Sequence, residues 1–203
     1  RTAALITNMD SPLGSAVGNS LEVIESVEIL KGKTSGNLWT VCRELSCRML
    51  MLAGIGDKDE CGRLVDEAVE SGEALMRFEM MVKLQGGDVS YIEDTSKFRK
   101  ASFSREVYAP ADGYITHMDS EKIGLTAVLL GAGREKKEDN INHAAGIKIA
   151  AKAGDFVKRG ELLATLFADN KSRLDGAESR YLSAVSIGDK KPAEQPMILD
   201  YID

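Results

Sequence analysis

One acidic segment contains residue types that could bind a metal. Residues 57–62 read DKDECG and begin like a calcium-binding loop. Such a loop needs an oxygen ligand at its fifth position and a bidentate acid at its twelfth, but Cys61 and Ala68 stand there. Asp57 and Glu60 have the spacing of a helix capping box. The segment therefore predicts a capped helix start rather than a calcium site.

A glycine-rich segment could cradle phosphate. Residues 131–134 read GAGR, without the Lys-Ser/Thr ending of a P-loop or the third glycine of a dinucleotide fold. This pattern favours a flexible loop. Its basic residues Arg134, Lys136 and Lys137 could still close over an anionic ligand, so lid behaviour of residues 131–146 is a hypothesis.

The remaining reactive side chains form no recognisable catalytic set. His117 and His143 are isolated from acid or cysteine clusters with metal-ligand spacing. Cys42, Cys47 and Cys61 lack CxxC spacing, which favours buried free thiols in a reducing cytosol. The residues alone therefore indicate no nucleophile and no active site.

Composition limits the class of protein. The chain has 203 residues and a net charge of −6, with 43% hydrophobic and 29% charged residues, as in folded soluble proteins. The acidic balance argues against a nucleic-acid binder. The longest apolar run, residues 125–130, is too short to span a bilayer, and no targeting leader is visible. We expect a cytoplasmic protein without nucleic-acid or membrane partners, and the start at Arg1 favours a piece of a longer protein.

The first half of the chain reads as helical. Ser11-Pro12 predicts a short helical turn that ends at Gly18, and Asn19 predicts a helix that ends before Gly32. Apolar residues recur at helical spacing in three further segments. These predicted helices cover residues 38–52, 57–70 and 75–84.

In the second half of the chain, the spacing of apolar residues is no longer helical throughout. Residues 86–104 are polar and irregular, so we place a domain boundary there. Short strands are predicted at 106–110, 113–116, 147–149 and 162–167. Helices are predicted at 121–130 and 172–185. The chain is therefore expected to be α+β, with domains at residues 1–104 and 105–203.

Two segments of the β-rich part resemble biotinyl or lipoyl carrier domains. Residues 107–115 and 154–163 have the pattern of strand and glycine-turn residues that is typical of the flattened barrel of those domains. A carrier also needs a hairpin-tip lysine in a Met-Lys-Met or Asp-Lys-Ala setting, which the sequence lacks. The sequence pattern thus favours a hammerhead or barrel-sandwich fold without carrier function.

A wider resemblance covers essentially the whole chain. Residues 4–25 read ALITNMDSPLGSAVGNSLEVIE and closely resemble a segment of the pyrimidine-nucleoside phosphorylase and thymidine phosphorylase family. Further blocks keep the family's order, namely QGGD at 85–88, APADGYI at 109–115, DSEKIGL at 119–125, LGAGR at 130–134, and GD at 154–155 with Lys158 and GE at 160–161. Family members are about twice as long, and this chain resembles their C-terminal half.

The resemblance implies an enzyme of nucleoside salvage. It would be a pentosyltransferase that cleaves uridine, thymidine or deoxyuridine with phosphate to the free base and a pentose 1-phosphate. The family's phosphate and base residues lie in its N-terminal half, so no catalytic or substrate-binding residue carries over and the fragment alone is expected to be inactive. The resemblance further implies a helical segment of the family's large α/β domain followed by a β-rich C-terminal domain, a homodimeric parent enzyme and no organic cofactor. The alternative is a non-catalytic carrier or binding module.

One site carries over in part. Broad-specificity members bind a monovalent cation, and potassium is the expected ion. The matching positions are Leu13 and Ala16, through main-chain carbonyls, and Glu25, through its carboxylate. Carbonyls three residues apart near the end of a short helical turn can point one way, and that end of the turn carries partial negative charge. Without the resemblance, Glu25 would be a solvated helix residue.

Two departures from the family pattern are visible. Ser11 stands where the family often has Gln, and Asn142 stands where Asp is usual. The second departure bears on any electrostatic role of the loop at residues 131–146.

Overall fold

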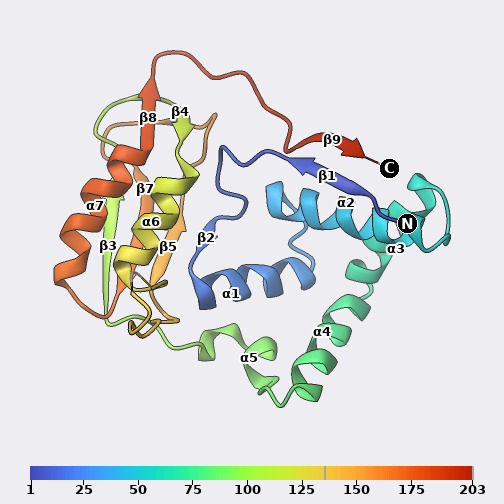
Figure 1. The fold of residues 1–203 in the computed structure, drawn as a ribbon. Coiled ribbons are helices and arrows are strands. Elements are labelled where there is room, and N and C mark those ends of the chain that lie inside the picture. The colour runs from blue at the N-terminus through green and yellow to red at the C-terminus, as the bar shows by residue number, and fades with distance from the viewer. Residues whose placement is uncertain (135, 203) are drawn as a thin grey trace. The chain divides into compact units, whose positions relative to one another are not determined.

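Two compact units make up the computed structural model, which describes residues 1–134 and 136–202 (Figure 1). The helical unit contains residues 1–8, 26–97 and 195–203, and the β-rich unit contains residues 9–25 and 98–194. These units do not coincide with the ranges 1–104 and 105–203. Residues 9–25 join the β-rich unit because they contribute a strand to it, and the C-terminal residues join the helical unit for the same reason.

Helices dominate the helical unit, where they follow the predicted periodicity. Their bounds are α1 (Asn19–Leu30, which begins in the β-rich unit), α2 (Gly36–Leu52), α3 (Lys58–Glu70), α4 (Glu73–Leu84), α5 (Ser90–Glu93) and the 3-10 helix η1 (Thr95–Lys97). The Asp57 side chain accepts the Glu60 N–H at 2.9 Å, so the acidic segment at 57–62 is a helix cap as predicted. The last two helices lie in the stretch that was predicted to be irregular.

A two-stranded antiparallel sheet joins the ends of the chain within the helical unit. Strand β1 (Ala4–Thr7) pairs with β9 (Ile198–Ile202), with Ala4 opposite Ile202. On β9, the Tyr201 ring lies 4.2 Å from the Arg48 guanidinium and 5.1 Å from the Lys58 ammonium. Both cations pair with the buried carboxylate of Glu44. This cluster ties the last strand to α2 and α3.

Two sheets form the β-rich unit. One has the order β2 (Ala16–Val17), β5 (Gly146–Ile149), β7 (Leu162–Ala168), β3 (Phe103–Tyr108), and the other has the order β6 (Phe156–Val157), β4 (Gly113–Met118), β8 (Val185–Gly188). The strand pairings in both sheets are antiparallel. The predicted strands are confirmed, but β3 and β4, which flank one short turn, belong to different sheets. A hammerhead or barrel-sandwich arrangement stays a prediction.

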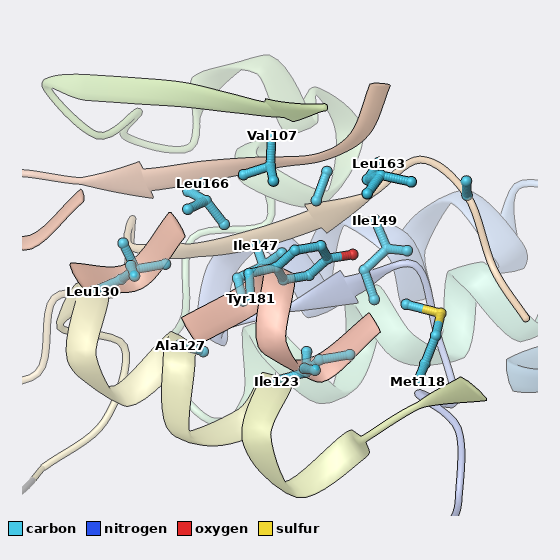
Figure 2. Packing of buried hydrophobic residues seen from close by; sticks show 14 of the residues in the cluster. Val107, Met118, Ile123, Ala127, Leu130, Ile147, Ile149, Leu163, Leu166 and Tyr181 are labelled. Carbon is cyan, nitrogen blue, oxygen red and sulfur yellow. The ribbon is translucent and has the colours of Figure 1, made fainter. Parts of the chain in front are cut away.

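The core of the β-rich unit lies between the four-stranded sheet and helices α6 (Ser120–Leu130) and α7 (Ser172–Ala184). Figure 2 shows the Tyr181 ring among Ile147 and Ile149 of β5 and Ala127 of α6. All four side chains are buried. Burial of this apolar surface is the main favourable contribution to the stability of the unit.

One local prediction is wrong. Residues 11–18 form bends and the strand β2 rather than a helical turn. Ser11-Pro12 is a local helix signal, but Ala16 and Val17 instead pair with Lys148 and Ile147, far away in the sequence. Pairing within the sheet overrides the local preference here.

Candidate functional site at the Glu25 turn

The predicted cation ligands lie around one tight turn, which we call the Glu25 turn: residues 13–16 together with the Glu25 side chain. Glu25 lies on α1 and is half-buried. Its Oε1 accepts the Ser15 N–H at 2.7 Å, and its Oε2 accepts the Ala16 N–H at 3.0 Å. Hydrogen bonds from two successive amides to one carboxylate are charge-assisted and strong. Glu25 is thus a helix residue, but its carboxylate has specific partners in the turn rather than solvent alone.

Gly14 permits this close approach. A Cβ atom at Gly14 would lie 2.3 Å from Glu25 Oε2 and 2.9 Å from its Cδ. Any side chain at this position would push the carboxylate away from the turn. The absence of a side chain at Gly14 therefore leaves the space that the Glu25 carboxylate occupies.

Sheet pairing fixes the turn on its other side. The Ile149 N–H donates to the Ser15 carbonyl at 2.7 Å. Gly18 and Gly146, at φ +138° and +151°, let the two backbones pass closely, since a Cβ at Gly146 would lie 2.4 Å from the Val17 carbonyl oxygen. The turn is thereby attached to strand β5 and not to a helix end, so the argument from helix-end carbonyls does not apply.

Lys152 interacts electrostatically with the Glu25 carboxylate. Burial lowers the pKa of Lys152, while the negative charges of Glu25 and Asp155 oppose this shift. Burial therefore disfavours the positive charge of Lys152 more than the two carboxylates favour it. This electrostatic setting is compatible with a further monovalent cation only where oxygen ligands surround that ion.

The donor set fits a hard cation in part. A carboxylate has about four lone-pair positions, and the two amides use two of them. Carboxylate and main-chain carbonyl oxygens are the ligands that hard cations prefer. Among the described residues, no group of three or more His, Cys, Asp or Glu side chains could hold a metal ion. A cation at this turn would therefore need the Leu13 and Ala16 carbonyls and ligands from elsewhere.

The glycine-rich segment at 131–134 is the end of α6 rather than a phosphate cradle. Gly131 caps the helix in the left-handed conformation, at φ +110°. The following loop is held by hydrogen bonds from the Asn142 N–H to the Gly131 carbonyl and from the Asn19 side chain to the Ala132 carbonyl. Arg134, Lys136 and Lys137 are exposed. Glu135 lies outside the described residues, and lid behaviour stays a hypothesis.

A polar cavity of about 630 Å³ lies beside this loop. Its wall includes Arg99, Asn142, His143, Asp169 and Arg173. Arg99 pairs with Asp169, and Arg173 donates to the Leu129 carbonyl at the end of α6. The two guanidiniums thus already have structural partners.

Asp169 organises the cavity wall. Its Oδ1 accepts the N–H and the hydroxyl of Ser102 at 2.8 and 2.9 Å, and its Oδ2 accepts the Asn142 amide at 2.9 Å. The Ser102 N–H above all, with Arg99 and Asn142, lowers the pKa of Asp169. An Asp at position 142 would lack the donor and would place a second negative charge there. The departure at Asn142 therefore has a structural reason, which the sequence alone did not reveal.

The isolated histidines and cysteines gain no catalytic setting. His117 lies exposed on β4, whereas His143 lines the polar cavity. Cys47 and Cys61 are buried as predicted, but the prediction of a buried thiol is wrong for Cys42, which is exposed on α2. None of the helices in the described part of the chain has the length and apolar character to cross a membrane.

The β-rich unit matches a known class of domain. Residues 114–188 match the pyrimidine nucleoside phosphorylase C-terminal domain. This range runs from β4 to β8 and includes α6, α7 and most of the core described above.

Similarity to curated proteins extends over nearly the whole chain. The chain is 34% identical over 200 residues to the pyrimidine-nucleoside phosphorylase of Geobacillus stearothermophilus, covering 98% of this chain and 46% of that protein. It is 40% identical over 173 residues to the enzyme of the same name from Bacillus subtilis, covering 85% of this chain and 40% of that protein. The chain thus spans less than half the length of these relatives. The chain belongs to the pyrimidine-nucleoside phosphorylase family. It corresponds to the C-terminal portion of the family's members.

Proposed function

We propose that this chain supplies the C-terminal part of a pyrimidine-nucleoside phosphorylase, a pentosyltransferase of nucleoside salvage that acts as a homodimer. The similarity over 98% of the chain to a phosphorylase is the observation that carries this proposal. The expected substrates are uridine, thymidine or deoxyuridine together with phosphate.

The proposed reaction is a displacement at the anomeric carbon. A phosphate oxygen forms a bond to C1′ while the bond from C1′ to the pyrimidine nitrogen breaks, and the base leaves with the electron pair and is protonated. This step needs groups that hold phosphate beside C1′ and donors that stabilise the departing base. We assign those groups to the portion of the enzyme that corresponds to the remainder of the relatives.

The role of this chain in the proposed site is to hold a monovalent cation, expected to be potassium. The Glu25 carboxylate and the Leu13 and Ala16 carbonyls would bind it, and the cation would supply positive charge near the phosphate. Gly14 and the hydrogen bonds from Ser15 and Ala16 would keep the carboxylate in position.

The test compares the isolated chain with a chimera. The chimera joins the N-terminal portion of the Bacillus subtilis relative to this chain, and uracil release from uridine is measured with and without phosphate. We expect no release by the 203-residue chain and phosphate-dependent release by the chimera. Activity of the isolated chain would contradict the predicted inactivity, and an inactive, folded chimera would contradict the proposed function.

The cation assignment has its own measurement. Replacement of potassium by choline should lower the phosphorolysis rate of the chimera, and Glu25→Gln should weaken this dependence on potassium. A rate that is equal in both salts would exclude a functional cation at the Glu25 turn.

A further inference from the structure

The helical unit contains an apolar groove, and we call this groove the helical groove. It has a volume of about 680 Å³, and its lining includes Leu30, Trp39, Cys42, Met49, Leu64 and Phe78. None of its lining residues is charged. A groove of this size and character indicates an apolar occupant.

Helix α4 contributes to this groove without being buried itself. Ala74 and Phe78 line the groove, yet no residue of α4 is buried. Its other face exposes Met76, Met80 and Leu84, which are 52%, 46% and 80% exposed. Their spacing of four residues places them in one stripe along the helix. Packing of apolar faces supplies most of the stability of helices in proteins, so an uncovered apolar stripe indicates a surface that another element can cover.

The small sheet of the same unit is also incomplete. Among the described strands, β1 pairs with β9 alone. A two-stranded sheet is marginally stable by itself, and an open edge can accept a further strand. Ile6 on β1 and Leu199 on β9 are 41% and 54% exposed. The missing partner therefore has the features of a polypeptide that can add a strand as well as apolar side chains.

Relative length identifies the occupant. More than half of each phosphorylase named above lies outside the region that matches this chain. We propose that the polypeptide corresponding to this remaining, N-terminal portion docks in the helical groove and against the exposed stripe of α4. This inference rests on the proposed function, because it takes the partner from the phosphorylase family.

Two residues of the groove report directly on its occupancy. Trp39 is the single tryptophan of the chain. Cys42 is an exposed thiol in the groove, whereas Cys47 and Cys61 are buried. Alkylation of Cys42, followed by mass spectrometry of the peptide that contains it, therefore measures cover of the groove.

The experiment compares the isolated chain with the chimera that carries the N-terminal portion of the Bacillus subtilis relative. We expect Cys42 to be alkylated at least about tenfold more slowly in the chimera, because a docked segment excludes the reagent. The fluorescence emission maximum of Trp39 is expected at a longer wavelength in the isolated chain than in the chimera, because Trp39 is partly exposed when the groove is empty.

Matched variants locate the contact. Leu84→Glu places a charge on the exposed stripe of α4 and should restore Cys42 alkylation in the chimera. Leu125→Glu makes the same change at an exposed leucine of α6, in the β-rich unit, and should leave the protection intact. Both positions are exposed in the isolated chain, so circular dichroism should show an unchanged fold.

Each outcome decides the proposal. Equal alkylation of Cys42 in the chimera and the isolated chain would overturn it, even if the chimera is active, in which case the proposed function would stand. Protection of Cys42 in a chimera without phosphorolysis would support docking and count against the function. Protection in the isolated chain that grows with concentration, together with dimers in ultracentrifugation, would identify a second copy as the occupant and overturn the proposal.

Discussion

Glu25 shows how a single carboxylate can organise a turn before any ligand is considered. Two main-chain amides donate to its two oxygens, and Gly14 leaves the space that this geometry needs. In the proposed enzyme the same oxygens would also face the cation. The structural role and the binding role of Glu25 can therefore be separated only by measuring both stability and activity.

Glu25→Gln should destabilise the isolated chain. A glutamine side chain has a single acceptor oxygen, so its NH2 group would face one of the two amides of Ser15 and Ala16. Because these hydrogen bonds are only partly buried, a donor left without its acceptor should cost about 1 kcal/mol, at the low end of the range for buried groups. Urea denaturation at pH 7 measures this loss, and Glu194→Gln, at an exposed position, serves as the control. Equal stability of both variants would contradict the importance of the turn.

Asp169 gives a stability contribution that depends on pH. Because its pKa is lowered in the folded protein, its ionised form stabilises the fold at pH values above its pKa in the unfolded chain, about 3.9. The contribution is lost as the pH falls through the lowered folded value. Because solvent screens these contacts, Asp169→Asn should reduce the free energy of unfolding by up to about 1 kcal/mol at pH 7, and by less as the pH falls below the pKa of Asp in the unfolded chain.

Chemical denaturation of both proteins between pH 7 and pH 3 tests this prediction. Asp189→Asn, which removes an exposed carboxylate, is the control and should change stability little. A difference between Asp169→Asn and the original chain that stays constant with pH would show that the carboxylate charge is not responsible.

At the scale of elements, α6 and α7 pack against the four-stranded sheet and contribute large side chains such as Ile123, Leu130 and Tyr181 to the core. Tyr181 on α7 is fully buried, and its hydroxyl has no hydrogen-bond partner within the described structure. Burial raises the pKa of Tyr181, because the ionised form would lose its hydration. The ring stabilises the core while the hydroxyl reduces that gain.

Tyr181→Phe should therefore stabilise the protein. Removal of an unsatisfied buried hydroxyl is worth on the order of 1 kcal/mol, while the ring contacts with Ile147 and Ala127 remain. Thermal and urea unfolding should both shift upward. Tyr181→Ala is the comparison and should cost about 3–5 kcal/mol through the cavity that it leaves. A destabilising Tyr181→Phe would show that the hydroxyl has a partner, such as a bound water.

At the scale of the whole molecule, each unit is built from separate stretches of chain. The β-rich unit takes residues 9–25 from near the N-terminus, and the helical unit takes residues 195–203 from the C-terminus. The Glu25 turn thus belongs to the unit that also contains the phosphorylase C-terminal domain match. This arrangement would place the cation ligands and that domain in one folding unit.

The intact mass distinguishes the proposed function from the carrier alternative. A phosphorylase portion should carry no covalent cofactor, so the purified chain should have the mass of its sequence, 22.0 kDa. The measurement is made after expression in cells that contain biotin and lipoate ligases. An added mass of biotin or lipoate on a lysine would favour a carrier module instead.

Helices were predicted well because their signals are local. Apolar spacing in α2 and α3 and the Asp57 cap lie within a few residues of the structure that they specify. The exposed stripe of α4 shows the limit of this reasoning. Its periodicity predicts a helix correctly, but it does not tell which apolar face is covered within the chain and which is left for a partner.

The sequence by itself determined the types of most elements, the family resemblance and the three candidate cation residues. Only the tertiary structure decided that Ala16 belongs to a strand, that Glu25 accepts two amides and that Asn142 donates to Asp169. Helical periodicity and capping depend on residues that are close together in the sequence, so they can be recognised locally. These other contacts join residues that are nine or more positions apart, and their geometry exists only once the turn and the sheet pairing have brought them together.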